Sequence, residues 1–175
     1  MIENQLLLSS VFIAGFLLAC SNKSKNKSKD NGNISSTKEI EHVKNYLDIQ
    51  KIRYDNKFTY EFIEKIETSS LYVPKLILQP IIENAIYHGI REKKSKSYIK
   101  IIVEKNPEYL IIKIIDNGLG PKEKKENIPT KLGGIGMENV NNRIKLLCGE
   151  KYNLKMQREN GETIVTYKLK IIKAI

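Results

Sequence analysis

The chain has 175 residues, enough for one domain of ordinary size and a short extension, but too few for two comfortable separate cores. Thirty Lys and Arg residues against 20 Asp and Glu residues give a formal net charge of +10, which favours anionic partners such as a polyphosphate nucleotide, a membrane surface or nucleic acid. No zinc finger, arginine-rich arm or aromatic RNA-binding signature accompanies this charge, so a nucleic-acid partner is not expected.

The first 37 residues contain two stretches of opposite character. An apolar run at 6–20 ends in Cys20, and residues 21–37 form a linker of Lys, Ser and Asn. Three interpretations of segment 1–20 stay open: a signal-like segment with a lipobox-like cysteine, a membrane anchor, or the remnant of a longer protein. The lysines after an anchor would leave the rest on the cytoplasmic side of a bacterial membrane, and a remnant would leave the chain in the cytoplasm.

An amphipathic helix is predicted over residues 38–54, opening at Thr37. Ile40, Val43 and Leu47 recur at intervals of three and four residues, so one face of this helix is apolar. That face either packs on the helix's own domain or forms part of a dimer interface. The looser alternation of residues 58–66 then predicts a strand.

A long apolar helix is predicted over residues 73–88, entered through Pro74 and bent or restarted at Pro80. Asn84 and His88 are four residues apart and share one face of such a helix. One amide oxygen together with phosphate oxygens is a sufficient ligand set for Mg²⁺. Taken alone, this pair more often forms a satisfied polar contact.

Two hairpins and a helix follow, and the turn residues at 106–108 and 159–162 join the strands of each hairpin. Together with the preceding elements they predict a two-layer α/β sandwich over residues 55–175, with a mixed, largely antiparallel sheet. The predicted elements are strands at 98–105 and 109–116, a helix at 137–147, and strands at 153–158 and 163–171.

An Asp-Asn-Gly-Leu-Gly segment at 116–120 ends the second of these strands. By itself such a segment is usually a turn, but a polar stretch follows it in place of a strand, as expected of a loop that covers a ligand. A carboxylate at Asp116 can accept the amino hydrogen of adenine, and Gly118 and Gly120 would allow the backbone to approach the base.

A glycine cluster at 133–136 leads directly into the helix predicted at 137–147. Backbone amides at the N-terminus of a helix, preceded by small residues, form an anion site suited to phosphate. A single cluster of this kind is weak evidence, because glycines before a helix can also form an ordinary turn.

In this order and with these gaps, the three segments resemble the N, G1 and G2 boxes of the GHKL ATPase superfamily, which shares the Bergerat fold. Residues 41–54, 74–89 and 134–144 further resemble the LytS-like and YesM-like sensor histidine kinases. The resemblance implies that the chain binds ATP and Mg²⁺. The residues it implies in this role are Asn84 on Mg²⁺, His88 near the nucleotide, Asp116 on the adenine amino group, Gly118 and Gly120 beside the base, Lys131, Gly134 and Gly136 at the phosphates, and Thr163 on the adenine.

Two positions depart from the family pattern. A complete kinase of this type has a phosphoacceptor motif like Asn-Pro-His-Phe upstream of the 38–54 helix, where this sequence has the apolar run and the linker. Neither His42 nor His88 replaces that histidine. Hydrolytic members place a glutamate one turn before the Mg²⁺-binding asparagine, and here that position is Pro80, so efficient ATP hydrolysis is not expected.

The resemblance therefore implies the ATP-binding catalytic domain of a two-component sensor histidine kinase. It would pass a phosphoryl group from Mg-ATP to a histidine supplied by another chain, with Glu83 as candidate base. The implied partners are a second copy or a partner kinase chain, and a response regulator through a full-length kinase. The alternative is a truncated or degenerate nucleotide-binding module without catalysis.

Overall fold

The computed structural model describes residues 33–67, 70–90, 95–120 and 135–173. The apolar run, the linker up to Gly32 and the polar stretch after Gly120 lie outside the described residues. In chain order the elements are β1 (Asn33–Ser35), α2 (Ser36–Arg53), β2 (Phe58–Glu64), β3 (Leu71–Pro74), α3 (Gln79–Asn84), the π-helix η2 (Ala85–Ile90), β4 (Ser97–Lys105), β5 (Tyr109–Asp116), α4 (Ile135–Cys148), β6 (Asn153–Glu159), β7 (Glu162–Lys170) and β8 (Ile172–Lys173).

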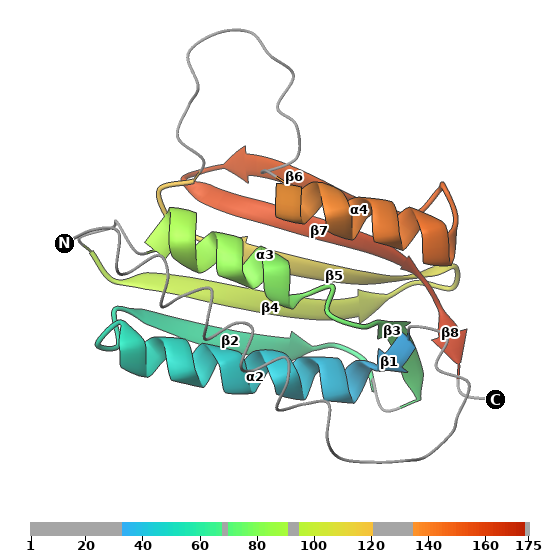
Figure 1. The fold of residues 1–175 in the computed structure, drawn as a ribbon, viewed down its shortest axis with the longest axis horizontal. Helices are drawn as coiled ribbons and strands as arrows, with labels where there is room; N and C mark the ends of the chain where they lie inside the picture. Colours follow the sequence, from blue (N-terminus) through green and yellow to red (C-terminus); the bar gives the residue numbers. More distant parts are fainter. Residues whose placement is uncertain (1–32, 68–69, 91–94, 121–134, 174–175) are drawn as a thin grey trace, which may run out of the picture. The chain divides into compact units, whose positions relative to one another are not determined.

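The larger sheet has five strands in the order β2-β4-β5-β7-β6. Strand β2 runs parallel to β4, and the other neighbouring pairs of this sheet are antiparallel. Helices α2, α3 and α4 cover one face of the sheet (Figure 1). The predicted fold class, a two-layer α/β sandwich with a mixed, largely antiparallel sheet, is confirmed.

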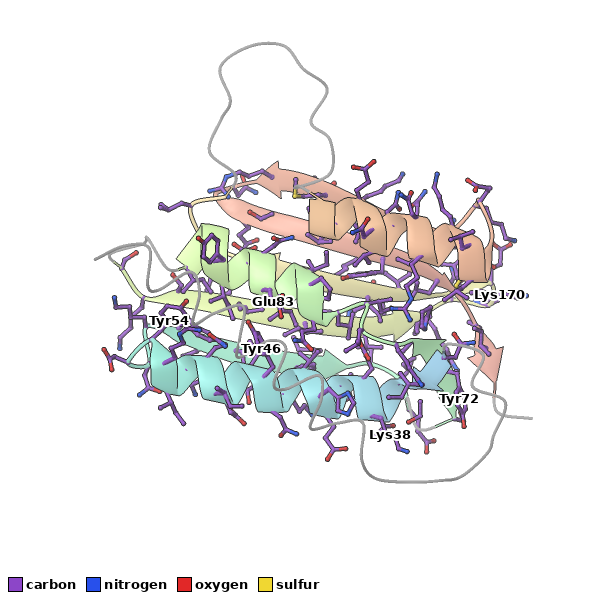
Figure 2. All side chains as sticks on the ribbon, viewed as in Figure 1. Lys38, Tyr46, Tyr54, Tyr72, Glu83 and Lys170 are labelled. Atoms are coloured by element: carbon purple, nitrogen blue, oxygen red, sulfur yellow. The ribbon has the colours of Figure 1, made fainter. Side chains whose placement is uncertain are left out.

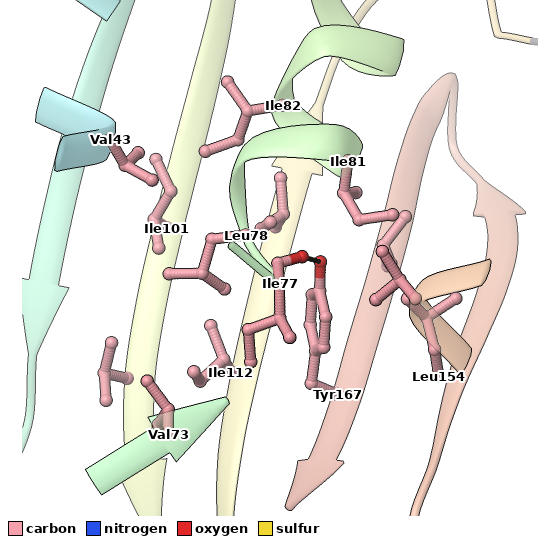
Figure 3. Packing of buried hydrophobic residues seen from close by; sticks show 14 of the residues in the cluster. Val43, Val73, Ile77, Leu78, Ile81, Ile82, Ile101, Ile112, Leu154 and Tyr167 are labelled. Atoms are coloured by element: carbon pink, nitrogen blue, oxygen red, sulfur yellow. Dashed lines mark hydrogen bonds between the residues drawn. The ribbon is translucent and has the colours of Figure 1, made fainter. Parts of the chain in front are cut away.

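The core lies between the sheet and the helices because each central strand buries every second residue. Figure 3 shows how aliphatic side chains from the strands and from α3 interdigitate there. Fully buried Tyr167 keeps its polar end satisfied, since its hydroxyl donates to the carbonyl oxygen of Ile77 at 2.7 Å. Strand β7 is thereby tied to the turn that precedes α3.

Helix α2 packs on its own domain through the predicted apolar face. Ile40, Val43 and Leu47 are buried, whereas Ile52 is 77% exposed. The helix begins at Ser36, one residue before the expected Thr37, because the Ser35 hydroxyl caps it by accepting from the backbone N–H of Lys38. A role of this helix in a dimer stays a prediction.

The prediction of a helix over residues 73–88 is wrong for the first third of that range. Residues 71–74 form strand β3, and Leu76 has a positive φ of 54°, which no α-helix accommodates. Helix α3 begins only at Gln79, so Pro80 occupies its first turn, where a missing N–H costs nothing. The buried carboxylate of Glu39, on α2, accepts hydrogen bonds from the backbone N–H groups of this preceding turn.

Both predicted hairpins are confirmed, with strands within a residue or two of the expected bounds. In the second, the turn is shorter than predicted and consists of Asn160 and Gly161, both with positive φ. This Asn-Gly pair forms the two-residue turn that suits the twist of a hairpin. The helix predicted at 137–147 is also present, as the slightly longer α4.

A second, small sheet in the order β1-β3-β8 was not predicted. Its strands are two to four residues long, too short to display an alternating pattern in the sequence. It places the residues just before α2 and the residues just after β7 on either side of β3. Among the described residues, no helix has the length and apolar character needed to cross a membrane.

Candidate functional site

A carboxylate and a hydroxyl meet at one end of the central strands. Asp116 is the last residue of β5 and continues its buried row, and Thr163 begins the buried row of β7. The two residues are direct partners in the antiparallel register. They are 4% and 6% exposed, so two polar side chains replace the aliphatic core at this end of the sheet. Paired buried polar groups of this kind suit a polar ligand.

The loop after Asp116 turns sharply back on that carboxylate. The backbone N–H of Gly118 donates to Asp116 Oδ1 at 2.9 Å. Asn117 secures the turn from the other side, because its side-chain Oδ1 accepts from the backbone N–H of Tyr98 at 2.8 Å. The direction of the Asp116 side chain is thus set by its own loop.

The same loop lies directly against η2. The backbone N–H of Leu119 donates to the carbonyl oxygen of Gly89 at 3.0 Å. A methyl group at Gly118 would lie 2.3 Å from the Cα of Gly89, and one at Gly89 would lie 2.9 Å from Asp116 Oδ1. Both positions therefore require glycine, because the two backbones could not approach this closely with side chains between them. Gly89 belongs to the N-box segment but was not predicted as a site residue.

The N-box helix reaches this cluster as a π-helix. Asn84, the predicted Mg²⁺ ligand, is the half-buried last residue of α3, five residues before Gly89. From Ala85 to Ile90 the turns widen to π geometry, which is rare in proteins and is frequently found at functional sites. His88 lies within this segment, and its side chain is outside the described part of the structure. Among the described residues, no group of three His, Cys, Asp or Glu side chains could hold a metal ion.

Glu83, the predicted base, is directed toward helix α2. Its carboxylate Oε1 accepts from Gln79 Nε2 at 2.9 Å. Figure 2 shows it between α3 and α2, with Tyr46 of α2 nearby. Burial raises the pKa of the Tyr46 hydroxyl, and the negative charge of Glu83 raises it further. Because this carboxylate is bound by Gln79 and faces α2, the catalytic role of Glu83 stays a prediction.

Two polar residues that the sequence reasoning missed flank the cluster. Arg158, on β6, donates from Nη1 to Thr163 Oγ1 at 2.9 Å and from Nη2 to the carbonyl oxygen of Gly118 at 3.1 Å. Tyr98 donates to the carboxylate of Glu162, the neighbour of Thr163, and this hydrogen bond is the main reason why its pKa rises to about 12. The Asn-Gly turn could have revealed Arg158, because a two-residue turn pairs it with Thr163.

The predicted phosphate residues are only partly described. Lys131 and Gly134 lie outside the described residues. Helix α4 begins at Ile135, so Gly136 is in its first turn, where helix amide groups point outward and favour anions. A methyl group there would meet nothing within 4 Å.

Curated relatives of the chain include several sensor kinases. The sensor histidine kinase YpdA of Escherichia coli is 34% identical over 79% of this chain, and the sensor protein LytS of Staphylococcus epidermidis is 29% identical over 78%. The chain spans about a quarter of these two proteins, 25% and 24% respectively. It covers 46% of the putative uncharacterized protein YwpD of Bacillus subtilis, at 30% identity.

Solved structures show the same fold. The Acinetobacter baumannii histidine kinase AdeS matches with a TM-score of 0.61 at 18% identity, covering 97% of this chain and 81% of AdeS. The catalytic domain of histidine kinase ThkA matches with a TM-score of 0.60 at 17% identity, covering 79% of this chain and 93% of that domain. No protein-family model matches the chain.

Proposed function

Because the domain described above belongs to the ATP-binding domains of LytS-like sensor histidine kinases, we propose that this chain binds Mg-ATP and passes its γ-phosphoryl group to a histidine on another chain. The bond between the γ-phosphorus and the bridging oxygen breaks, ADP leaves, and a phosphorus–nitrogen bond forms at the imidazole, which releases its N–H proton. Transfer of this kind depends chiefly on positioning and charge stabilisation, which a rigid nucleotide site supplies.

The pairing of Asp116 with Thr163 is the observation that carries the proposal. The structure supports a base-binding role because both side chains are buried and lie opposite one another at a strand end. The fixed Asp116 carboxylate would accept the amino hydrogen of adenine. Gly118 and Gly120 are proposed to lie beside the base, in the loop that orients Asp116.

The remaining predicted residues would hold the phosphates and the metal. Asn84 would contribute its amide oxygen to Mg²⁺, whose role is to neutralise phosphate charge, with His88 near the nucleotide. Gly136, at the start of α4, fits a phosphate site by its place in the first helical turn. Lys131 and Gly134 are proposed for the same phosphates from the sequence alone. Glu83 is proposed as the base.

The proposal also names partners and a location. The acceptor histidine would come from a second copy or a partner kinase chain, and a response regulator would be reached through a full-length kinase. One of the solved neighbours is a complex of histidine kinase ThkA with the response regulator protein TrrA. ATP as substrate would place the domain in the cytoplasm, or on the cytoplasmic side of the membrane if residues 6–20 act as an anchor.

A calorimetric titration with Mg-ATP and Mg-GTP tests the nucleotide site. The chain should bind ATP in preference to GTP, and Asp116→Ala should weaken ATP binding by about 1–3 kcal/mol, because the adenine amino group loses its acceptor. Equal affinities for the two nucleotides in the unchanged chain would refute adenine recognition. Nucleotide binding without any transfer to a supplied acceptor helix would instead favour the noncatalytic module.

A further inference from the structure

Arg158 touches three parts of the proposed base site. It is an exposed residue of edge strand β6, and its guanidinium donates to the hydroxyl of Thr163 and to the carbonyl oxygen of Gly118. It also lies against Gly120, where a methyl group would come within 2.2 Å of Arg158 Nη1. The side chain thus joins the last hairpin to the loop that follows Asp116.

The chemistry of these contacts constrains the Thr163 hydroxyl. A guanidinium has five N–H donors and no acceptor, so the Thr163 oxygen can only accept from it. The hydroxyl hydrogen must then point elsewhere. Thr163 is 6% exposed, and Asp116 is its partner across the strands, so its hydrogen is confined to the buried strand end. There the hydroxyl acts as a donor, beside a carboxylate that acts as an acceptor.

We propose that Arg158 is a positioning residue that sets nucleotide specificity by fixing the Thr163 hydroxyl as a donor. This inference rests on the proposed function, since it assigns the selectivity of the same nucleotide site. An acceptor beside a donor matches adenine, which presents its amino group next to a ring-nitrogen acceptor. Guanine presents a carbonyl acceptor at the place of that amino group, so it meets the Asp116 carboxylate with the wrong polarity.

Loss of Arg158 would release the Thr163 hydroxyl and leave the Asp116 carboxylate unchanged. With no donor on its oxygen, the Thr163 hydroxyl can rotate and accept a hydrogen bond from the ring N–H of guanine. Asp116 still rejects the guanine carbonyl, so selectivity falls without disappearing. Sites that satisfy a ligand's hydrogen-bonding groups discriminate mainly through the unpaired groups that the wrong ligand leaves behind.

Three substitutions separate this role from simple support of the loop. Arg158→Lys retains a donor-only group, whereas Arg158→Gln retains a polar side chain whose amide oxygen can accept from Thr163. Arg158→Ala removes the side chain. Lys155→Ala is the matched control, because it removes one positive charge from an exposed position on the same strand.

Calorimetric Kd values for Mg-ATP and Mg-GTP are measured for each variant. We expect the preference for ATP over GTP to fall about tenfold in the Ala and Gln variants. A tenfold change corresponds to the free energy of roughly one hydrogen bond. In the Lys variant, the preference for ATP over GTP should stay within about threefold of that of the unchanged chain. Lysine still donates to the Thr163 oxygen, and a hydrogen bond that is only weakened costs little free energy. The Lys155 control should keep the full preference. In a Thr163→Val background, Arg158→Gln should have no further effect on the preference, because the hydroxyl that it acts through is gone.

The measurements distinguish a role of Arg158 in nucleotide specificity from mere support of the loop. If the unchanged chain prefers ATP and Arg158→Gln keeps that preference, or if ATP and GTP weaken equally in all three variants, Arg158 only supports the loop and the inference is wrong. If the unchanged chain binds neither nucleotide, the proposed function fails first, and the inference fails with it.

Discussion

Gly118 lies directly against the backbone of a neighbouring element in the candidate site. A methyl group at this position would lie 2.3 Å from the Cα and 2.8 Å from the carbonyl oxygen of Gly89, and both are backbone atoms that cannot rotate away. We therefore expect Gly118→Ala to destabilise the fold by about 1–3 kcal/mol, the usual cost of overpacking, and to weaken ATP binding. Urea unfolding and calorimetry measure the two effects.

Gly136→Ala is the control for the stability measurement. A methyl group at Gly136 would meet nothing within 4 Å, and alanine is the better helix former, so the free energy of unfolding should not fall. Equal destabilisation by the two substitutions would mean that the close approach of Gly118 to Gly89 does not exist in solution.

Asn84 offers a test of the metal site that is independent of base recognition. If its amide oxygen acts through Mg²⁺, Asn84→Ala should weaken ATP binding about tenfold or more in the presence of Mg²⁺ and much less in EDTA. The same loss under both conditions would show that Asn84 only packs against the nucleotide. Asp116→Ala serves as the contrast, because its effect should be similar with and without the metal.

Individual site residues were foreseeable to different degrees. The place of Asp116 follows from the sequence, because an apolar strand runs directly into it and ends there. Its pairing with Thr163 needs the register of β5 on β7, which depends on contacts between segments about 50 residues apart in the chain. Arg158 shows no signal of its own on an exposed edge strand, and only the short Asn-Gly turn links it to Thr163.

At the scale of elements, Glu39 holds the N-box helix in place. Its buried carboxylate accepts from the backbone N–H groups of Leu76, Ile77 and Leu78, at 2.9 to 3.2 Å. These groups precede the first turn of α3, where unpaired N–H groups accumulate and a negative charge is favourable. One side chain thereby joins helix α2 to the turn that precedes helix α3.

Glu39→Ala should destabilise the domain by about 3 kcal/mol or more, because it leaves buried N–H groups without an acceptor. Glu41→Ala, at an exposed position on the same helix, should change the unfolding free energy by less than about 0.5 kcal/mol. Urea denaturation followed by circular dichroism measures both values. If both variants lost similarly small amounts of unfolding free energy, the hydrogen bonds to Glu39 would not stabilise the domain as proposed.

The contact of Glu39 with residues 76–78 explains why the prediction of a helix over 73–88 was wrong. Its apolar residues suit a helix, but periodicity is a local signal and cannot register a carboxylate 37 residues earlier in the chain. Leu76 adopts a positive φ in the turn that this carboxylate stabilises. The π geometry of η2 was equally hidden, since nothing in the composition of residues 85–90 distinguishes it from an α-helix.

At the scale of the whole molecule, the order of the elements was the most predictable feature. Strong alternation in β4, β5 and β7, and the turn residues between them, identify the sheet, and the apolar faces of the helices identify the layer on it. Strand order and the small β1-β3-β8 sheet required the three-dimensional structure, because pairing partners far apart in sequence leave no local trace.

The arrangement of the whole domain also leads to a prediction about self-phosphorylation. The sequence has two histidines. His42 is exposed on α2, while Ile40 and Val43 beside it are buried against the domain, so it lies on the solvent-facing side of that helix. His88 belongs to η2, next to Gly89, and is proposed to bind the nucleotide. We expect neither histidine to accept the γ-phosphoryl group of an ATP molecule bound to its own chain.

We therefore expect the 175-residue chain to bind ATP without becoming phosphorylated, because transfer requires an acceptor held in line with the phosphoryl group. Water should substitute poorly, since Pro80 stands where hydrolytic relatives of this fold place a glutamate. The measurement is incubation with γ-labelled ATP and a test for acid-labile phosphohistidine, with and without a separately supplied acceptor helix from a related kinase. Label only on the supplied helix would support a working kinase domain. Acid-labile label on the chain alone that His42→Ala abolishes would show instead that α2 carries the acceptor, reached from a second copy of the chain.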